Sequence, residues 1–467
     1  MKKIAIYNTL TRSREEIVPE SDQLVRIYSC GLTVYDFAHI GNLRKYVFDD
    51  LLRRTLLYFG YKVKQVMNIT DVGHLTSDAD EGEDKVEAGA KREKKSASEL
   101  AEYYEKEFVK DLKSLNVLMP DLMPRATDHI KEQIELVKTL EKKDFTYKTS
   151  DGVYFDTSRL PDYGKLAKLK TEGQEEGKRV EKNPEKKNPT DFALWKFSPS
   201  GAKRQMEWES PWGVGFPGWH LECSAMSTKY LGQPFEIHTG GVDHISVHHT
   251  NEIAQSEAAA GKPLAKYWLH SDFLLQGGKK MAKSEGHFIR LQDIEKRGFE
   301  PLDFRMLCLG AHYRSKLDFS WEALRAARMR LVDLRREFTL FLDKDKEGGE
   351  EFYRGKLEKF ENALTDDLNT PKALAVLSEA IASREEFGGK AKEDFAKKVD
   401  KILGLNLLQR ETPPKDIIEL VKKRKAARLE RNFKESDRLR IEINKKGWEI
   451  DDLPSGGYAL GKGLTKR

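Results

Sequence analysis

The sequence predicts an α/β protein in which a parallel, nucleotide-binding sheet is followed by a helical bundle and a small basic C-terminal part. Three observations lead to this prediction. A strand–helix–strand pattern lies near the N-terminus, a helix-rich stretch runs from 320 to 407, and positive charge accumulates after 410. At 467 residues the chain is long enough for several domains, each with its own core.

The strand–helix–strand pattern spans residues 24–69. Residues 24–29 (Leu-Val-Arg-Ile-Tyr-Ser) are typical of a short apolar strand, and residues 62–69 of a second one. Between them, apolar residues recur at helical spacing from Leu43 to Leu56, and Gly60 is a typical C-terminal stop. The pattern predicts a βαβ unit.

The predicted helix begins at His39-Ile40-Gly41-Asn42. The unpaired N–H groups and the dipole of a helix N-terminus attract phosphate. Gly41 has no side chain, so a nucleotide can come close to the backbone, and His39 and Asn42 can donate hydrogen bonds to phosphate oxygens. For an isolated four-residue match, the simpler interpretation is that His39 caps the helix and Gly41 relieves crowding.

A second basic segment, Gln276 to Lys280, is glycine-rich and continues into Met281-Ala282-Lys283-Ser284. Lys280 and Lys283 can place positive charge on a departing pyrophosphate, where negative charge develops in the transition state. The alternative is an exposed basic turn, which is common in a chain with 34% charged residues.

The cysteines suggest a metal site. Cys30 follows the first strand, Cys223 lies in Gly-Trp-His-Leu-Glu-Cys, and His248 and Glu252 are four residues apart, on one face of a helix. Two thiolates, an imidazole and a carboxylate suit tetrahedral zinc, although buried free cysteines are the alternative. Cys308 lies in an apolar helical stretch and is expected in the core, without a function.

Composition indicates a large enzyme in a reducing compartment. Mean hydropathy is −0.66, no apolar stretch reaches the length of a membrane span, and the N-terminal apolar run is too short for a signal peptide. Three cysteines in a chain of this length are typical of the cytoplasm. We therefore expect a cytoplasmic location and no membrane contact.

The middle of the chain predicts several smaller elements. Ser96 to Glu99 fits a capping box, and Thr127 is expected to cap a helix whose apolar residues face inward. Residues 145–147 and 153–155 are predicted to form a hairpin, within an insertion that splits the nucleotide-binding fold. The charge run 81–95 is expected to be a surface loop.

The C-terminal part carries a surplus of positive charge. Residues 411–467 contain 15 Lys and Arg against 10 Asp and Glu, which equals the net charge of the whole chain, +5. A basic stripe on one predicted helix suits an RNA backbone, and Trp448 or Tyr458 could stack on bases. A solvated basic helix is the alternative. The stripe consists of Lys422, Lys423, Arg424, Lys425, Arg428, Arg431, Lys434, Arg438 and Arg440.

Taken together, these segments resemble the cysteinyl-tRNA synthetase family of class I aminoacyl-tRNA synthetases, along essentially the whole chain. The order of the segments is that of the family. They are YSCGLTVYDFAHIGN, NITDVGHLTSDADEGEDK, NPTDFALWK, ESPWGVGFPGWHLECSAMS, GGVDHISVHHTNEIAQSEA, KMAKS and AHYRSKLDFS.

The resemblance implies roles for the matching residues. Cys30, Cys223, His248 and Glu252 fall on the zinc-ligand positions, and Trp219 could wall the amino-acid pocket. His39 and Asn42 occupy the ends of the HIGH signature, and Lys280 and Lys283 the lysines of KMSKS. Two departures are Asn42 for the final histidine and Ala282 for the serine; we expect activity to survive both. The expected ATP contacts are His39, Gly41, Asn42, Lys280, Met281 and Lys283.

The resemblance also implies the reaction and its partners. The expected enzyme is a cysteine–tRNA ligase that uses ATP with Mg²⁺, L-cysteine and tRNA(Cys), holds one Zn²⁺ per chain, and is a monomer. The zinc selects the substrate thiol against a hydroxyl. The residues expected to contact tRNA are Arg428, Arg431, Lys434 and Arg438.

The implied fold is a Rossmann-type sheet split by an insertion, followed by an α-helical bundle and a small C-terminal α+β tRNA-binding domain. The expected divisions are a first Rossmann half (1–127), a connective insertion (128–212), a second Rossmann half (213–262), a stem-contact region with the KMSKS-like loop (263–322), the bundle (323–409) and an anticodon-binding domain (410–467).

Three other functions compete with this one. A cysteine ligase with a small-amine acceptor, similar to mycothiol ligase, would have no use for a tRNA-reading C-terminal domain. A non-catalytic RNA-binding relative should have lost zinc ligands or signature lysines, which are all present. A zinc hydrolase fits worse, because the chain has no HExxH sequence.

Overall fold

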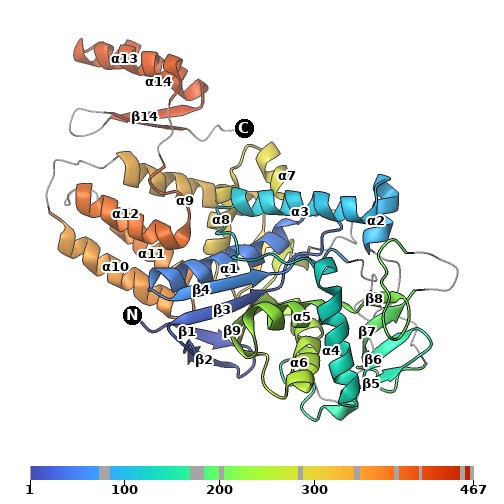
Figure 1. The fold of residues 1–467 in the computed structure, drawn as a ribbon. Coiled ribbons are helices and arrows are strands. Elements are labelled where there is room, and N and C mark those ends of the chain that lie inside the picture. Colours follow the sequence, from blue (N-terminus) through green and yellow to red (C-terminus); the bar gives the residue numbers. More distant parts are fainter. Residues whose placement is uncertain are drawn as a thin grey trace. The chain divides into compact units, whose positions relative to one another are not determined.

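The computed structural model describes residues 2–72, 85–168, 184–198, 204–281, 288–340, 348–382, 389–409, 413–452 and 458–462. These residues form two compact units (Figure 1). The first contains residues 1–301, 311–319 and 365–368. The second contains residues 302–310, 320–364 and 369–467.

A four-stranded parallel sheet forms the centre of the first unit. Its strand order is β10–β9–β3–β4, and every neighbouring pair is parallel. The first predicted strand is confirmed as β3 (Leu24–Ser29), and the second as β4 (Lys62–Met67). The other two strands, β9 (Phe235–Gly241) and β10 (Ala265–Ser271), come from far along the chain. The Rossmann-type sheet is therefore assembled from two separated halves.

Helices cover both faces of this sheet. The helix α1 (Ile40–Tyr58) lies on one face, and α5 (Trp219–Leu231) and α6 (His248–Ala260) lie on the other (Figure 1). The predicted βαβ unit is confirmed, and the helix stops just before Gly60, whose φ is +88°. The buried residues that pack between the sheet and the helices α5 and α6 include Tyr28, Val66, Met226, Phe235, Ile253 and Trp268.

An antiparallel sheet separates the two halves along the chain. Its order is β5–β6–β7–β8, and the predicted hairpin is confirmed as its first two strands. The helix α4 (Ile130–Lys142) precedes it and packs on it through Val137 and Leu140. The strands are β5 (Thr146–Lys148), β6 (Gly152–Phe155), β7 (Phe192–Phe197) and β8 (Gly215–Pro217).

Two expectations in this unit are wrong. Thr127 does not cap α4, because its hydroxyl donates a hydrogen bond of 2.5 Å to Asp71 Oδ2, and a 3₁₀ turn precedes the helix. The charge run is not all loop, because residues Lys85–Glu93 form the helix α2, which places Val86 and Ala90 in the core. The predicted capping box at Ser96 is confirmed, and starts α3 (Ala97–Ser114).

The remaining elements of the first unit are short. A hairpin joins β1 (Ala5–Asn8) and β2 (Ser13–Glu16), and a small sheet has the order β12–β11–β13. Its strands are β11 (Leu274–Gln276), β12 (Lys279–Lys280) and β13 (Leu317–Phe319). The short helices are α7 (Leu291–Lys296), η1 (Thr127–His129), η2 (Thr157–Arg159) and η3 (Val242–His244).

The second unit is helical, as the periodicity from 320 to 407 predicts. Gly348 and Gly349, both with positive φ, precede its third helix, and Asn369 caps its fourth by accepting a hydrogen bond of 3.1 Å from Lys372 N. Its buried residues include Phe338, Phe360, Leu374, Leu377, Phe395 and Val399. The helices are α8 (Pro301–Leu309), α9 (Trp321–Leu340), α10 (Glu350–Thr365), α11 (Thr370–Ala382) and α12 (Gly389–Leu403).

The C-terminal part pairs two helices with a hairpin. The single basic helix that we expected is wrong: the chain forms α13 (Lys415–Leu429) and α14 (Phe433–Lys445). The break occurs at Arg431, whose φ is +57°, and Asn432 caps the second helix. The base-stacking role considered for Trp448 is not supported, because this side chain is 5% exposed in the core of α13, α14 and the hairpin. The hairpin strands are β14 (Trp448–Asp452) and β15 (Tyr458–Lys462).

Among the described residues, none of the helices combines the length and the apolar character that a membrane crossing requires.

Candidate active site

A cavity of about 430 Å³ opens at the carboxyl ends of the parallel strands. This edge of an α/β sheet is the usual place for a ligand. The cavity is lined from several elements: the residues that follow β3, the start of α1, the start of α5 and α6, and the segment around β11 and β12. The candidate phosphate-binding and metal-binding residues therefore share one cavity.

The turn at His39 forms one part of the wall. His39 Nδ1 accepts a hydrogen bond of 3.1 Å from Asn42 N, and Asn42 Oδ1 accepts one of 3.2 Å from His39 N, which makes a reciprocal cap for α1. A side chain at Gly41 would lie 2.8 Å from His39 Nδ1, so glycine relieves crowding. The simpler interpretation of these residues is thus correct, but all three also line the cavity.

The lysine segment approaches the same cavity. Lys280 and Met281 line it, and Lys280 Nζ lies 3.1 Å from Asp243 Oδ2 and 4.4 Å from the centre of the Phe273 ring. Lys280 is half-exposed, so its ammonium can be drawn towards a bound anion. Ala282 and Lys283 lie outside the described residues.

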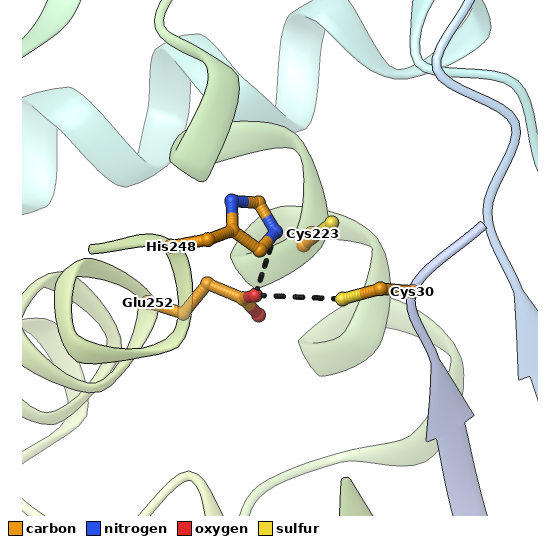
Figure 2. A group of neighbouring side chains, drawn as sticks. All are labelled: Cys30, Cys223, His248 and Glu252. Atoms are coloured by element: carbon orange, nitrogen blue, oxygen red, sulfur yellow. Dashed lines mark hydrogen bonds and ion pairs between the residues drawn. The ribbon is translucent and has the colours of Figure 1, made fainter. Parts of the chain in front are cut away.

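The structure brings Cys30, Cys223, His248 and Glu252 together (Figure 2). Cys30 follows β3, Cys223 lies in α5, and the other two lie one turn apart in α6. Their donor atoms all lie within 4.8 Å of one another, and each residue is at most 3% exposed. Glu252 Oε1 lies 2.9 Å from His248 Nε2 and 3.8 Å from Cys30 Sγ.

A second set of donors overlaps with the first. Cys30 and Glu252 also lie close to His238 and His249, neither of which our sequence analysis considered. His249 Nε2 lies 3.2 Å from Cys30 Sγ, and His238 Nε2 lies 2.8 Å from Glu252 Oε2. Neither of these histidines lines the cavity, whereas Cys30, Cys223 and His248 do. The first set is the one that a substrate in the cavity can reach.

The electrostatics of the first set fit a bound cation. Burial raises the pKa of the Cys30 thiol, but its hydrogen bond with Cys223 and the charge of His249 hold that pKa well below the usual value. The pKa of Cys223 is raised well above its usual value by the same hydrogen bond and by burial. Burial would lower the pKa of His248, but the charge of Glu252 raises it to about 10. The group thus holds protons that a divalent cation would replace. Two sulfurs, an imidazole and a carboxylate are a donor set that suits Zn²⁺.

Trp219 forms the wall beside this cluster. Its ring stacks on His248 at 4.3 Å between ring centres and an angle of 30°, and it lines the cavity. His220 does not line the cavity; its Nδ1 lies 3.0 Å from His248 Nδ1, so it supports the orientation of that ring.

Several cavity residues escaped the sequence analysis. Lys45, Asn68, Thr70, Asp243 and His244 all line the cavity. Of these, only Lys45 could have been noticed in the sequence, because it lies four residues before Asp49 on the helix α1, and this spacing predicts an intrahelical ion pair. The others depend on how loops after different strands meet, which spacing does not reveal.

The four residues expected to contact tRNA are exposed. Arg428 lies in α13, Arg431 in the turn, and Lys434 and Arg438 in α14, where Arg438 forms ion pairs with two glutamates. Exposed Leu429 and Phe433 lie among them in the sequence. Arg424, which we counted in the basic stripe, is 2% exposed and so is not part of that surface.

Comparison with known proteins identifies the family. Residues 16–329 match the family described as tRNA synthetases class I (C) catalytic domain, and residues 359–407 match the DALR domain. Cysteine–tRNA ligase 1 of Burkholderia lata is 49% identical over 99% of this chain and 97% of its own length. The chain belongs to the cysteinyl-tRNA synthetase family. Cysteine–tRNA ligase of Treponema denticola is 42% identical over 96% of this chain and 98% of its own length.

Class I aminoacyl-tRNA synthetases are ligases that use a tRNA, ATP and an amino acid. Because the cysteinyl-tRNA synthetases match nearly the full chain, a small-amine ligase is not favoured. Solved structures agree on the fold. Mycobacterium tuberculosis methionyl-tRNA synthetase bound by methionyl-adenylate is 13% identical, with a TM-score of 0.54 over 82% of this chain and 90% of that one. A putative arginyl-tRNA synthetase from Campylobacter jejuni is also 13% identical, with a TM-score of 0.51 over 83% of this chain and 92% of that one.

Proposed function

We propose that this chain activates L-cysteine with ATP to cysteinyl-adenylate and transfers the cysteine to the 3′-terminal ribose of tRNA(Cys). One observation carries the proposal. A single cavity is lined both by thiol and imidazole donors and by phosphate-binding groups. The donors are Cys30, Cys223 and His248, and the phosphate-binding groups are the N-terminus of α1 and Lys280. A thiol-bearing amino acid and a triphosphate can therefore meet in it.

Cys30, Cys223, His248 and Glu252 would hold one Zn²⁺ per chain. When bound, Zn²⁺ supplies a centre that binds a thiolate strongly and a hydroxyl weakly, which separates cysteine from serine where packing alone discriminates poorly. Glu252 Oε1 and His248 Nε2 lie 2.9 Å apart, so both atoms could reach one ion, and His238 contacts the other Glu252 oxygen at 2.8 Å. Trp219 would close the pocket over the amino acid.

The other end of the cavity would hold ATP with Mg²⁺. The N–H groups at the start of α1, with His39 and Asn42, would bind phosphate, and Gly41 and Met281 would lie against the nucleotide. Lys280, joined by Lys283, would neutralise the leaving pyrophosphate. The carboxylate of cysteine attacks the α-phosphorus, so positioning and charge stabilisation account for the rate and no protein nucleophile is needed.

The C-terminal helices would bind the tRNA. Arg428, Arg431, Lys434 and Arg438 are exposed and would contact backbone phosphates. The 410–467 part would then serve as the anticodon-binding domain. The remaining boundaries, at 127, 212, 262 and 322, also stay as predictions, and we propose a monomer located in the cytoplasm.

Two assays test this function. Cysteine-dependent exchange of pyrophosphate into ATP measures activation, and labelled cysteine, with serine in parallel, measures charging of unfractionated tRNA. We expect cysteine to be activated and charged, and serine to give neither. Charging of serine at a comparable rate, or no cysteine-dependent exchange, would refute the proposal.

A matched pair of variants tests the metal ligands. Cys223→Ser should lose bound zinc and cysteine activation, while circular dichroism shows a folded chain. Cys308→Ser replaces a cysteine that is also buried but lies in α8 of the second unit, and should keep one zinc per chain. Full zinc content and activity in Cys223→Ser would remove Cys223 from the metal site.

A further inference from the structure

Lys45 is a buried cation at the wall of the active-site cavity. It lies in α1 one turn after Asn42, and only 8% of it is exposed, yet it lines the cavity. Its Nζ donates a hydrogen bond of 2.6 Å to the backbone oxygen of Cys30 and lies 2.7 Å from Asp49 Oδ2. The ammonium is thus fixed beside the residue that begins the metal cluster.

The ion pair with Asp49 has a direction. Asp49 is 2% exposed and does not line the cavity, whereas Lys45 does. Lys45 is therefore the member of the pair that reaches the cavity wall, whereas Asp49 is buried away from it. An ammonium has three N–H groups, and the only hydrogen bond that the described residues take from this one is that to the Cys30 backbone oxygen. The contact with Asp49 is an ion pair, so the ammonium keeps N–H donors for a further ligand.

A buried pair of this kind contributes little to stability, because taking both charges out of water costs about as much as their attraction returns. Two apolar side chains could fill the same place. We therefore explain the pair by its effect on the cavity, whose wall gains a positive charge at a fixed position.

The position of Lys45 indicates the group that it would bind. The metal cluster begins at Cys30, which Lys45 contacts, and the phosphate-binding turn ends at Asn42, three residues before Lys45 on the same helix. The carboxylate of cysteine must lie between its own thiol and the α-phosphorus that it attacks. Lys45 thus lies next to the cluster that would bind the thiol of cysteine and to the turn that would bind the phosphates of ATP.

We propose that Lys45 binds the carboxylate of the cysteine substrate and positions it for attack, with Asp49 holding the ammonium in place. The proposal rests on the proposed cysteine activation. The alternative is that Lys45 only holds the backbone of Cys30, in which case it supports the thiol-binding cluster and does not distinguish amino acids from amines.

Equilibrium binding of two ligands separates these alternatives. Cysteine and cysteamine share the thiol and the amine, but cysteamine has no carboxylate. Titration calorimetry on the zinc-loaded protein should show that Lys45→Met raises the Kd for cysteine by about tenfold or more, the size of a charge-assisted hydrogen bond. The Kd for cysteamine should change less than twofold, and the zinc content should not change.

A second variant is needed because Lys45→Met leaves Asp49 buried without its partner, which could unfold the chain. Lys45→Met/Asp49→Leu removes both charges and should give the same selective loss. Equal weakening of both ligands, loss of zinc, or no weakening of cysteine would overturn the assignment. Binding needs no turnover, so this result is separate from the exchange assay: absence of cysteine-dependent exchange in the unmodified chain would refute the proposed function instead.

Discussion

Replacing Asp111 with asparagine should stabilise the protein, and increasingly so as the pH rises. Asp111 lies in α3 and is 3% exposed; its Oδ1 accepts a hydrogen bond of 2.9 Å from Gln292 Nε2 in α7. Burial, then the charges of Glu107 and Glu295, raise its pKa from 3.8 to about 7. Within the described residues, Asp111 Oδ2 and Gln292 Oε1 have no hydrogen-bond partner. Asparagine keeps an acceptor for Gln292, carries no charge, and brings N–H donors to a place with unpaired oxygens.

The sign of the effect follows from the direction of the shift. Because folding raises this pKa, the folded chain keeps a proton that the unfolded chain releases between about pH 4 and pH 7. Stability from the group is fully present below about pH 4 and is lost as the pH rises through about 7. A difference of about three pKa units corresponds to at most about 4 kcal/mol above pH 7. At pH 5 the difference falls to less than about 2 kcal/mol.

Thermal unfolding at pH 8 and pH 5 measures this effect. Asp111→Asn should raise the melting temperature at pH 8 by several degrees, and by clearly less at pH 5. Asp394→Asn, on an exposed position of α12, removes the same charge without burial and is the matched control. A lower melting temperature for Asp111→Asn at both pH values, or a difference that does not vary with pH, would refute the reasoning.

Other predictions follow from the same geometry. Lys280→Ala should lower cysteine-dependent exchange by about 100-fold, the cost of one group that stabilises developing charge, whereas Lys279→Ala, next to it on β12, should stay within twofold. Arg428→Ala should raise the KM for tRNA and reduce the salt dependence of tRNA binding by about one phosphate contact, with no effect on exchange. Gly31→Ala should lower stability by about 3 kcal/mol, because its Cβ would lie 1.6 Å from a backbone oxygen, and its control Gly355→Ala, which meets nothing within 4 Å in α10, should stabilise by about 0.5–1 kcal/mol. Unaltered melting of Gly31→Ala would contradict the packing shown here.

Regular periodicity made the βαβ unit predictable almost to the residue. The strand β3 and the stop of α1 before Gly60 follow from apolar spacing and a glycine, and neither needs a distant partner. The breaks in the C-terminal part were not predictable in the same way. Arg431 adopts a left-handed conformation without being glycine, and Asn432 caps α14, so a charged run that looked continuous forms two helices.

Long-range contacts explain the other differences. Thr127 looked like a helix cap, but Asp71, which follows β4, takes its hydroxyl, and no local pattern shows that competition. Trp448 was considered as a residue that stacks on RNA bases, but it fills the small core between α13, α14 and the hairpin. His238 comes into the candidate metal cluster because β9, which carries it, lies next to β3 in the sheet, whereas His249 enters from α6, beside His248.

The split of the central sheet has a consequence for how the protein is made. Of the four candidate metal ligands, Cys30 precedes the antiparallel sheet β5–β6–β7–β8 in the chain, while Cys223, His248 and Glu252 all follow it. A ribosome that has synthesised the first 220 residues has therefore produced one donor atom and none of its partners. These four residues could hold a metal ion only after β9 has joined β3 and the start of α6 has left the exit tunnel. Until then Cys30 is a solitary thiol on an unfinished sheet, open to oxidation, which places a demand on the reducing capacity of the surroundings during synthesis that the finished protein no longer makes.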